Sequence, residues 1–196
     1  MRTLMVMSAL LALWLAYAVS PFLSVYRLVD VVGRRDAKAL SERVDFPALR
    51  GSLSTQIART YIRITGKAEE PGSPRERVLV AFAASVAAPI VAELVSPDAL
   101  LDLLKTGRPV EVAPDIPAMA GGLSSEALGN VWRAYVNSEL GIARFFLNVP
   151  VDKPREERLR LQFCLRSWTW MLCGIELPEP LLVVLAQELI RREKSR

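Results

Sequence analysis

The chain has 196 residues, 52% of them hydrophobic, with 25 Lys and Arg against 21 Asp and Glu and a net charge of +4. It has two cysteines and no histidine, so it lacks the commonest general base, the commonest metal ligand and any triad that uses histidine. Acidic residues are interspersed with the basic ones, which argues against nucleic acid as a partner. We expect a non-catalytic protein that has no metal and no cofactor.

Residues 4–19 carry no charge and follow a single basic residue, Arg2. An uncleaved membrane anchor needs about 20 apolar residues, or about 17 at the short end. A cleaved signal peptide needs only about 7 to 15, followed by small residues such as those of Ala16-Tyr17-Ala18. Because the apolar pattern continues beyond that site, residues 1–23 are predicted to be an uncleaved signal anchor. Secretion after cleavage near Ala18 is the alternative.

The charges on the two sides of this segment conflict over its orientation. Positive residues mark the cytoplasmic side of a membrane segment. Arg27, Arg34, Arg35 and Lys38 follow the segment, whereas only Arg2 and the α-amino group precede it. Export signals work with one or two leading charges, so the bulk of the chain is predicted to lie outside the cytoplasm.

Residues 24–196 suit a single domain, whose first half is predicted to be helical. The apolar pattern continues to Gly33, a plausible residue to end that helix. Asp36 and Asp45 can each cap the helix that follows it. The second of these helices carries an amphipathic stripe at three- and four-residue steps. Its members are Phe46, Leu49, Leu53, Ile57, Tyr61 and Ile64.

The segment Val78–Ala92 contains no charged residue, which fits either a second membrane segment or a buried helix. It is short for a membrane span and is bracketed by Arg77 and Glu93, so a core helix covered by other elements is predicted. A short helix follows from Ser96-Pro97-Asp98. The irregular stretch 108–130 is predicted to be a surface loop.

The second half alternates apolar and polar residues, which is typical of strands. Strands are predicted at 131–136 and 142–149, joined around 137–141, and then at 158–166 and 168–177. A charged turn, 150–157, separates the two pairs. With a final amphipathic helix from Pro180 to about Lys194, the pattern predicts an α+β fold. It has a hydrophobic N-terminal helix, a helical first half, a curved antiparallel meander of about four strands and a C-terminal helix.

The two cysteines lie on neighbouring predicted strands. With a turn centred on Arg166-Ser167, Cys164 faces Thr169 and Cys173 faces Arg160, which is too far apart for a disulfide. A shifted register or a bulge would bring the thiols together, and an oxidising compartment would favour the bond. The simplest register therefore predicts no bridge.

Arg158, Arg160 and Arg166 lie on one side of their predicted strand, and Arg155 is close in sequence. Guanidinium groups bind phosphates well, so these four arginines are candidates for contact with an anionic lipid surface. A solvated face of the sheet is the simpler interpretation.

Several blocks of the sequence can be compared with a known family. The most specific is Val44-Asp45-Phe46-Pro47-Ala48-Leu49-Arg50, with Asp36 before it and Leu53 and Gln56 after it. Val95-Ser96-Pro97-Asp98 follows, and the last block contains Trp170, Leu172, Ile175 and Pro178. Together they resemble an uncharacterised bacterial family, domain of unknown function number 2939. The resemblance implies a membrane-anchored or exported protein and no known activity.

Three functional hypotheses follow. The first is a single-pass protein of the bacterial inner membrane whose periplasmic domain binds a protein partner. The second is an envelope domain that binds lipid or another small ligand between the Ala-rich helix and the sheet, as the similar order of elements in cystatin- and NTF2-like folds would allow. The third is a hydrolase that uses Asp45 and Glu93, although a helix cap and a helix-end charge explain these two residues more simply.

Overall fold

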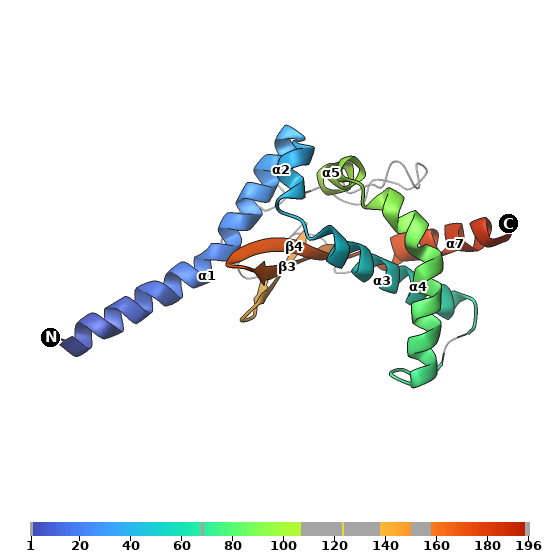
Figure 1. Cartoon of the computed structure of the whole chain (residues 1–196), viewed down its shortest axis with the longest axis horizontal. Coiled ribbons are helices and arrows are strands. Elements are labelled where there is room, and N and C mark those ends of the chain that lie inside the picture. The colour runs from blue at the N-terminus through green and yellow to red at the C-terminus, as the bar shows by residue number, and fades with distance from the viewer. Residues whose placement is uncertain (1, 68, 107–122, 124–137, 150–157, 195–196) are drawn as a thin grey trace.

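The computed structural model describes residues 2–67, 69–106, 123, 138–149 and 158–194. It confirms an α+β fold, in which a long N-terminal helix leads into a helical first half, a four-stranded antiparallel sheet and a C-terminal helix (Figure 1). The elements are α1 (Arg2–Arg34), α2 (Ala37–Ser41), α3 (Phe46–Ile64), α4 (Pro74–Leu94), α5 (Pro97–Thr106), β1 (Ser138–Leu140), β2 (Arg144–Val149), β3 (Leu159–Arg166), β4 (Thr169–Glu176) and α7 (Glu179–Lys194).

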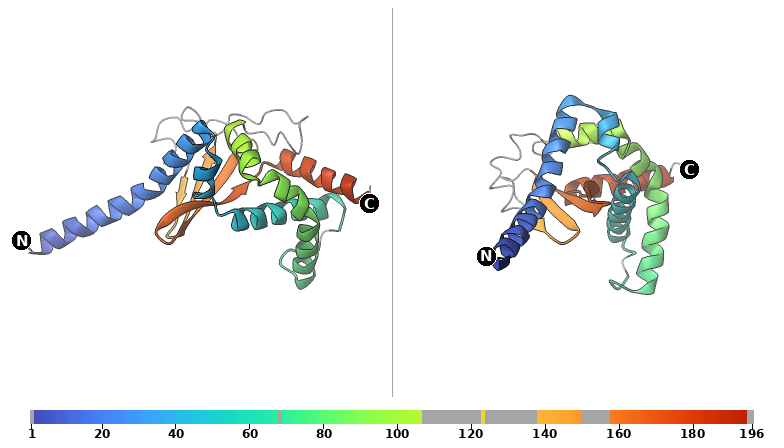
Figure 2. Two further views of the ribbon diagram at one scale, coloured as in Figure 1. Left: turned by 45° about the horizontal axis from the view of Figure 1, so that its top comes forward. Right: turned by 60° about the vertical axis from the view of Figure 1, so that its left-hand side comes forward.

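Helix α1 has two halves in different surroundings. Residues 3–16 are all exposed, whereas Val25, Leu28 and Val32 are buried in the core. The first half extends away from the rest of the fold, and the second half lies against it (Figures 1 and 2). The apolar residues beyond Ala18 therefore have a second explanation, because the domain itself buries several of them.

Helix α1 ends two residues later than predicted. Gly33 lies inside the helix, and the left-handed position that ends it is occupied by Arg35, with φ 55°. The amide of Arg35 donates to the carbonyl of Val32, and that of Asp36 donates to the carbonyl of Val31, both at 3.2 Å. These two bonds form a Schellman motif, which satisfies carbonyls at the helix end without a glycine.

The predicted caps of α2 and α3 are confirmed. The Asp36 side chain accepts a hydrogen bond from the Ala39 amide at 2.9 Å, and the Asp45 side chain accepts one from the Ala48 amide at 3.1 Å. Pro47 lies in the first turn of α3, where its missing N–H has no helical partner to lose.

Helix α3 forms the centre of the fold. It packs against α4 on one side and against β4 and α7 on another. Leu49, Leu53 and Ile57 from the predicted stripe are fully buried, and Ile64 at the end of the helix is 39% exposed. The main core joins this helix to the second half of α1, to α5 and α7, and to the inner face of the sheet.

The sheet has the strand order β1-β2-β3-β4, so it is the predicted meander. Its first hairpin differs from the prediction. Residues 138–140, expected in the connection, form β1, and Ile142, expected in a strand, lies in the turn before β2. The predicted strand 131–136, the charged turn 150–157 and the loop 108–130 except Leu123 lie outside the described residues. Leu123 is buried.

The hairpin of β3 and β4 also has a register other than the simplest one. Its turn is centred on Ser167-Trp168, one residue later than predicted, and pairs Cys164 with Met171. A bulge between Gln162 and Phe163 then leaves Cys173 as an extra residue on β4. Val44 extends the sheet by a single parallel bridge to Leu172, which ties the start of α3 to β4.

Candidate functional site at the junction of the long helix and the sheet

A chain of hydrogen bonds joins α1 to the sheet at the middle of the helix. Pro21 has no N–H to donate to the carbonyl of Tyr17, and the Ser20 hydroxyl donates to that carbonyl at 2.8 Å. The indole N–H of Trp170 in turn donates to the Ser20 hydroxyl oxygen at 2.9 Å. The proline therefore frees a backbone group that the serine uses to position β4 on α1.

Aromatic side chains surround this hydrogen-bonded chain. The ring of Tyr17 lies 6.2 Å from that of Trp170, and its hydroxyl donates to the carbonyl of Ile142 in the first hairpin. One turn further along α1, Phe22 packs edge-on against Phe145 of β2, with 5.0 Å between ring centroids. Both hairpins are thus held against the same stretch of α1, residues 17–22.

The ends of the two hairpins carry exposed apolar side chains. Ile142 is 91% exposed and Trp168 is 93% exposed. Arg144 and Arg166 lie two residues from these positions and are exposed as well. Nothing in the described fold covers Ile142 or Trp168, although the hairpins that carry them contact α1 through the Ile142 carbonyl and Trp170.

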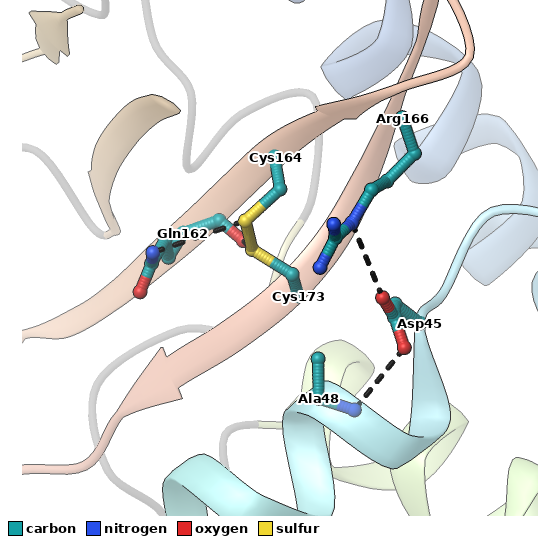
Figure 3. The surroundings of a disulfide bond; sticks show 6 residues. All are labelled: Asp45, Ala48, Gln162, Cys164, Arg166 and Cys173. Atoms are coloured by element: carbon teal, nitrogen blue, oxygen red, sulfur yellow. Dashed lines mark hydrogen bonds and ion pairs between the residues drawn. A yellow bond between two sulfur atoms is a disulfide. The ribbon is translucent and has the colours of Figure 1, made fainter. Parts of the chain in front are cut away.

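Cys164 and Cys173 form a disulfide between β3 and β4, with their Cα atoms 5.8 Å apart (Figure 3). The expectation of no bridge was wrong. The later turn and the bulge together move Cys173 next to Cys164, whereas the simplest register would have placed it opposite Arg160. The bond covalently fixes the hairpin whose end carries Trp168.

The predicted arginines do not form one free basic face. Arg160 lies between Glu139, at 2.6 Å, and Glu176, at 3.4 Å, and stacks over Phe146 at 4.3 Å. Arg166 reaches Asp45 at 3.7 Å, as Figure 3 shows. Arg158 lines a surface pocket on the same face together with Arg160 and three glutamates, and Arg155 lies outside the described residues. Contact of these arginines with an anionic surface stays a prediction.

The residues that carry the family resemblance hold α3, β4 and their neighbours together. Arg50 donates to the carbonyl of Val95 at 3.3 Å and lies over the ring of Phe46, and Asp45 caps α3. Asp36 caps α2, and Pro47 opens α3. The remaining predicted positions are buried: Val44, Leu49, Trp170, Leu172, Ile175 and Pro178.

Gln56 belongs to the block that resembles the family, but the sequence predicted no role for it. Its side-chain amide donates to the carbonyl of Ile175 at 2.8 Å and accepts from the amide of Leu177 at 3.1 Å. A glutamine facing a strand edge pairs with the backbone as another strand would. Its position on α3, three residues after the buried Leu53, was the available signal.

The pair suggested for hydrolysis has other partners. Glu93 on α4 accepts two hydrogen bonds from Arg192 of α7, at 3.0 and 3.2 Å, and Asp45 is a helix cap. Glu188 also binds Arg192, and hydrogen bonds from Arg191 and Arg192 lower the pKa of the Glu188 carboxyl. Among the residues that the structure describes, no group of three Cys, Asp or Glu side chains could hold a metal ion.

The described part of the fold leaves one apolar face of helix α4 uncovered. Ala83, Ala87 and Ile90 are buried, whereas Val78 is 72% exposed and Phe82 67% exposed. Small residues continue the exposed face along the helix: Ala81, Ser85, Ala88, Pro89 and Ala92. The helix was predicted to be covered by other elements, and the described elements cover only one side of it.

The hydrogen bonds at the junction predict a loss of stability on substitution of Ser20. Ser20→Ala leaves the N–H of the buried Trp170 and the carbonyl of Tyr17 without these partners, which should cost about 1–3 kcal/mol of unfolding free energy. Denaturant unfolding of detergent-solubilised protein, followed by near-ultraviolet circular dichroism, measures this cost. Ser8→Ala removes a similar hydroxyl-to-carbonyl bond from the exposed half of the helix and should change little. Equal effects of the two substitutions would contradict this role of Ser20.

Comparisons with known proteins add one finding. A family model described as protein of unknown function (DUF2939) matches residues 10–103, which extend from the first third of α1 to within α5. No curated protein and no solved structure matches the chain significantly, so a cystatin- or NTF2-like architecture stays a prediction.

Proposed function

Through residues 10–103 this chain belongs to the family of proteins of unknown function DUF2939, and we propose that it is a non-catalytic, membrane-tethered protein of the bacterial envelope. In this proposal α1 anchors the chain in the inner membrane, and the domain on the periplasmic side binds a protein partner through the uncovered face of α4. The observation that carries it is a fold with apolar surface at two separate places, the free half of α1 and the outer face of α4.

The first of these surfaces supports the anchor. Two described helices, within residues 3–34 and 74–94, are long and apolar enough to cross a membrane, although a signal sequence or a core helix has the same composition. Only the first has a half that stands clear of the fold, and exposing so much apolar surface to water is unfavourable. A bilayer removes this surface from water.

The disulfide supports the periplasmic side. Disulfides persist in oxidising compartments and are rare in the reducing cytosol. A bond between Cys164 and Cys173 therefore favours an exported domain, even though the count of positive charges around α1 favours the opposite orientation.

The uncovered face of α4 supports a protein partner. Val78 and Phe82 are large apolar side chains on one side of a helix whose other side packs on α3. Beyond them the exposed small residues permit the close approach of another helix. Helix α4 is part of the folded domain and lies away from the free half of α1 (Figure 2). This position favours a protein partner on the outer face of α4 over a second membrane span.

A ligand between α4 and the sheet is the second candidate function. The space between α4 and the sheet is occupied by α3, which contacts both α4 and β4 and whose Leu53 and Ile57 are buried. A lipid would have to displace part of the core, so we favour the protein partner.

Site-specific photocrosslinking in living cells tests this proposal. A benzoylphenylalanine at position 82 of the full chain should crosslink to a protein, and adding Val78→Glu should abolish that product by placing a charge on the face. The same probe at the exposed Arg59 of α3 is the matched control and should not give it. No protein adduct at position 82, or an adduct unaffected by Val78→Glu, would contradict binding through this face.

A thiol assay on the same cells tests the compartment. Acid-quenched cells are treated with a maleimide mass tag before and after reduction. We expect two tags to add only after reduction, because the cysteines are paired outside the cytosol. Immediate addition of both tags in unreduced samples would show a reduced cytosolic domain.

A further inference from the structure

The uncharged part of α1 that stands clear of the fold, between the charged Arg2 and the junction at Tyr17, is too short to cross a bilayer. Residues 3–16 give about 21 Å of helix at 1.5 Å per residue. The hydrocarbon core of a bilayer is about 30 Å thick and needs about 20 helical residues. A span that begins at Thr3 therefore ends near Phe22, within the stretch where the sheet already contacts the helix.

The hairpins contact α1 at residues 17–22, which the span needs in addition to residues 3–16. Tyr17 is bonded to the carbonyl of Ile142, and Ser20 is bonded to the indole of Trp170. The ends of both hairpins lie on the side of the fold from which the free half of α1 emerges (Figures 1 and 2). A bilayer deep enough to cover α1 to Phe22 must also reach these hairpin ends.

We propose that the ends of the β1–β2 and β3–β4 hairpins, centred on Ile142 and Trp168, insert into the interfacial layer of the bilayer that holds α1. This inference rests on the anchoring role proposed above. Ile142 and Trp168 are almost fully exposed in the fold, and the interfacial layer is where tryptophan is enriched in membrane proteins. Arg144 and Arg166 flank them and bring positive charge to the level of anionic headgroups.

The backbone of the second hairpin gives independent support. Ser167 and Trp168 have φ of 46° and 66°, the left-handed conformation that both central residues of a type I′ hairpin turn require and that asparagine and glycine adopt most easily. A bulky side chain is unfavourable there. Trp168 makes the turn less stable than glycine would and is 93% exposed, so the part of the chain that the structure describes gives no packing reason for a tryptophan at this position.

The test uses the full chain labelled with 5-fluorotryptophan in nanodiscs of phosphatidylethanolamine and phosphatidylglycerol. The four fluorine resonances are assigned by replacing each tryptophan with phenylalanine. Two nitroxide lipids, labelled at the headgroup or at mid-chain, and a soluble gadolinium chelate then report the depth of each ring. Phe82→Trp supplies a matched control, since position 82 is an exposed aromatic of α4, a helix that lies away from the free half of α1.

We expect the resonance of Trp14 to be broadened by the mid-chain nitroxide and that of Trp168 by the headgroup nitroxide. Gadolinium should broaden the resonance at position 82 and spare that of Trp168. A second variant, Ile142→Trp, should add a resonance that behaves like that of Trp168.

Two other results would overturn the inference in different ways. If Trp14 is in lipid and gadolinium broadens Trp168 as strongly as position 82, the anchor stands and the hairpin insertion is wrong. If gadolinium also reaches Trp14, the anchoring role fails, and the insertion fails with it.

Discussion

A chain that lacks residues 2–34 should fail to fold, whereas a chain that lacks only residues 2–18 should fold and form its disulfide. The shorter deletion removes the exposed half of α1 together with the half-buried Tyr17 and Ala18, and it leaves the buried residues of the core half in place. The longer one also removes six apolar side chains that belong to or pack against the core: Phe22, Val25, Leu28, Val29, Val31 and Val32. At about 1.5–3 kcal/mol for each buried apolar side chain, the loss is as large as the whole stability of a typical domain, about 5–15 kcal/mol.

Both chains would be exported to the periplasm behind a cleavable leader and scored by soluble yield and by the thiol assay. Equal yields of oxidised protein would show that the core half of α1 is dispensable. Two point substitutions on the same helix provide the matched comparison. Leu28→Ala, at a buried position, should cost about 2–5 kcal/mol. Leu10→Ala, at a position 61% exposed, should change the unfolding free energy by less than about 0.5 kcal/mol.

Replacing both cysteines with alanine should lower the unfolding free energy by about 2–3 kcal/mol and the melting temperature by about 4–12 °C. The bond closes a short loop, with nine positions separating the cysteines, so the expected effect is at the low end of the usual range. Thermal unfolding of the full chain in detergent, followed by circular dichroism, gives both quantities.

Reduction of the wild-type protein provides the control for this prediction. In dithiothreitol its melting temperature should fall to that of the double-alanine chain, whose own melting temperature should not respond to the reductant. A wild-type protein that melts identically with and without reductant would contradict the stabilising role of the bond between Cys164 and Cys173.

Much of the fold was predictable because local signals and the apolar pattern agree. Asp36 and Asp45 cap the helices that they were expected to cap, and the α3 stripe is buried at Leu49, Leu53 and Ile57. The alternation of residues 158–166 identified β3. In each of these cases the signal lies within one or two turns of the helix or within a single strand.

The errors arose where the outcome depends on pairing between strands. A turn at Ser167-Trp168 has no Asn or Gly to indicate it, and a bulge leaves no mark in the alternation of β4. The disulfide depends on both features, which is why a register argument placed the cysteines apart. The spacing of Gln56 after Leu53 indicates only that its side chain faces the packed side of α3, and its role depends on the facing edge of β4, which that spacing does not predict.

The apolar residues after Ala18 show a different kind of ambiguity. A membrane span and a buried helix face select the same side chains, so the sequence pattern alone cannot divide α1 between them. The contacts of the second half with Phe145 and Trp170 make that division.

The single helix from Arg2 to Arg34 has a mechanical consequence. No flexible linker separates the exposed half from the packed half, so in the proposed anchored state the domain would not pivot freely above the bilayer as a body on a disordered stalk would. The outer face of α4 would then be held at a fixed distance from the bilayer and in a fixed orientation relative to it. A partner anchored in the same membrane would encounter this face in a restricted set of orientations. This restriction raises the effective concentration of the α4 face for that partner.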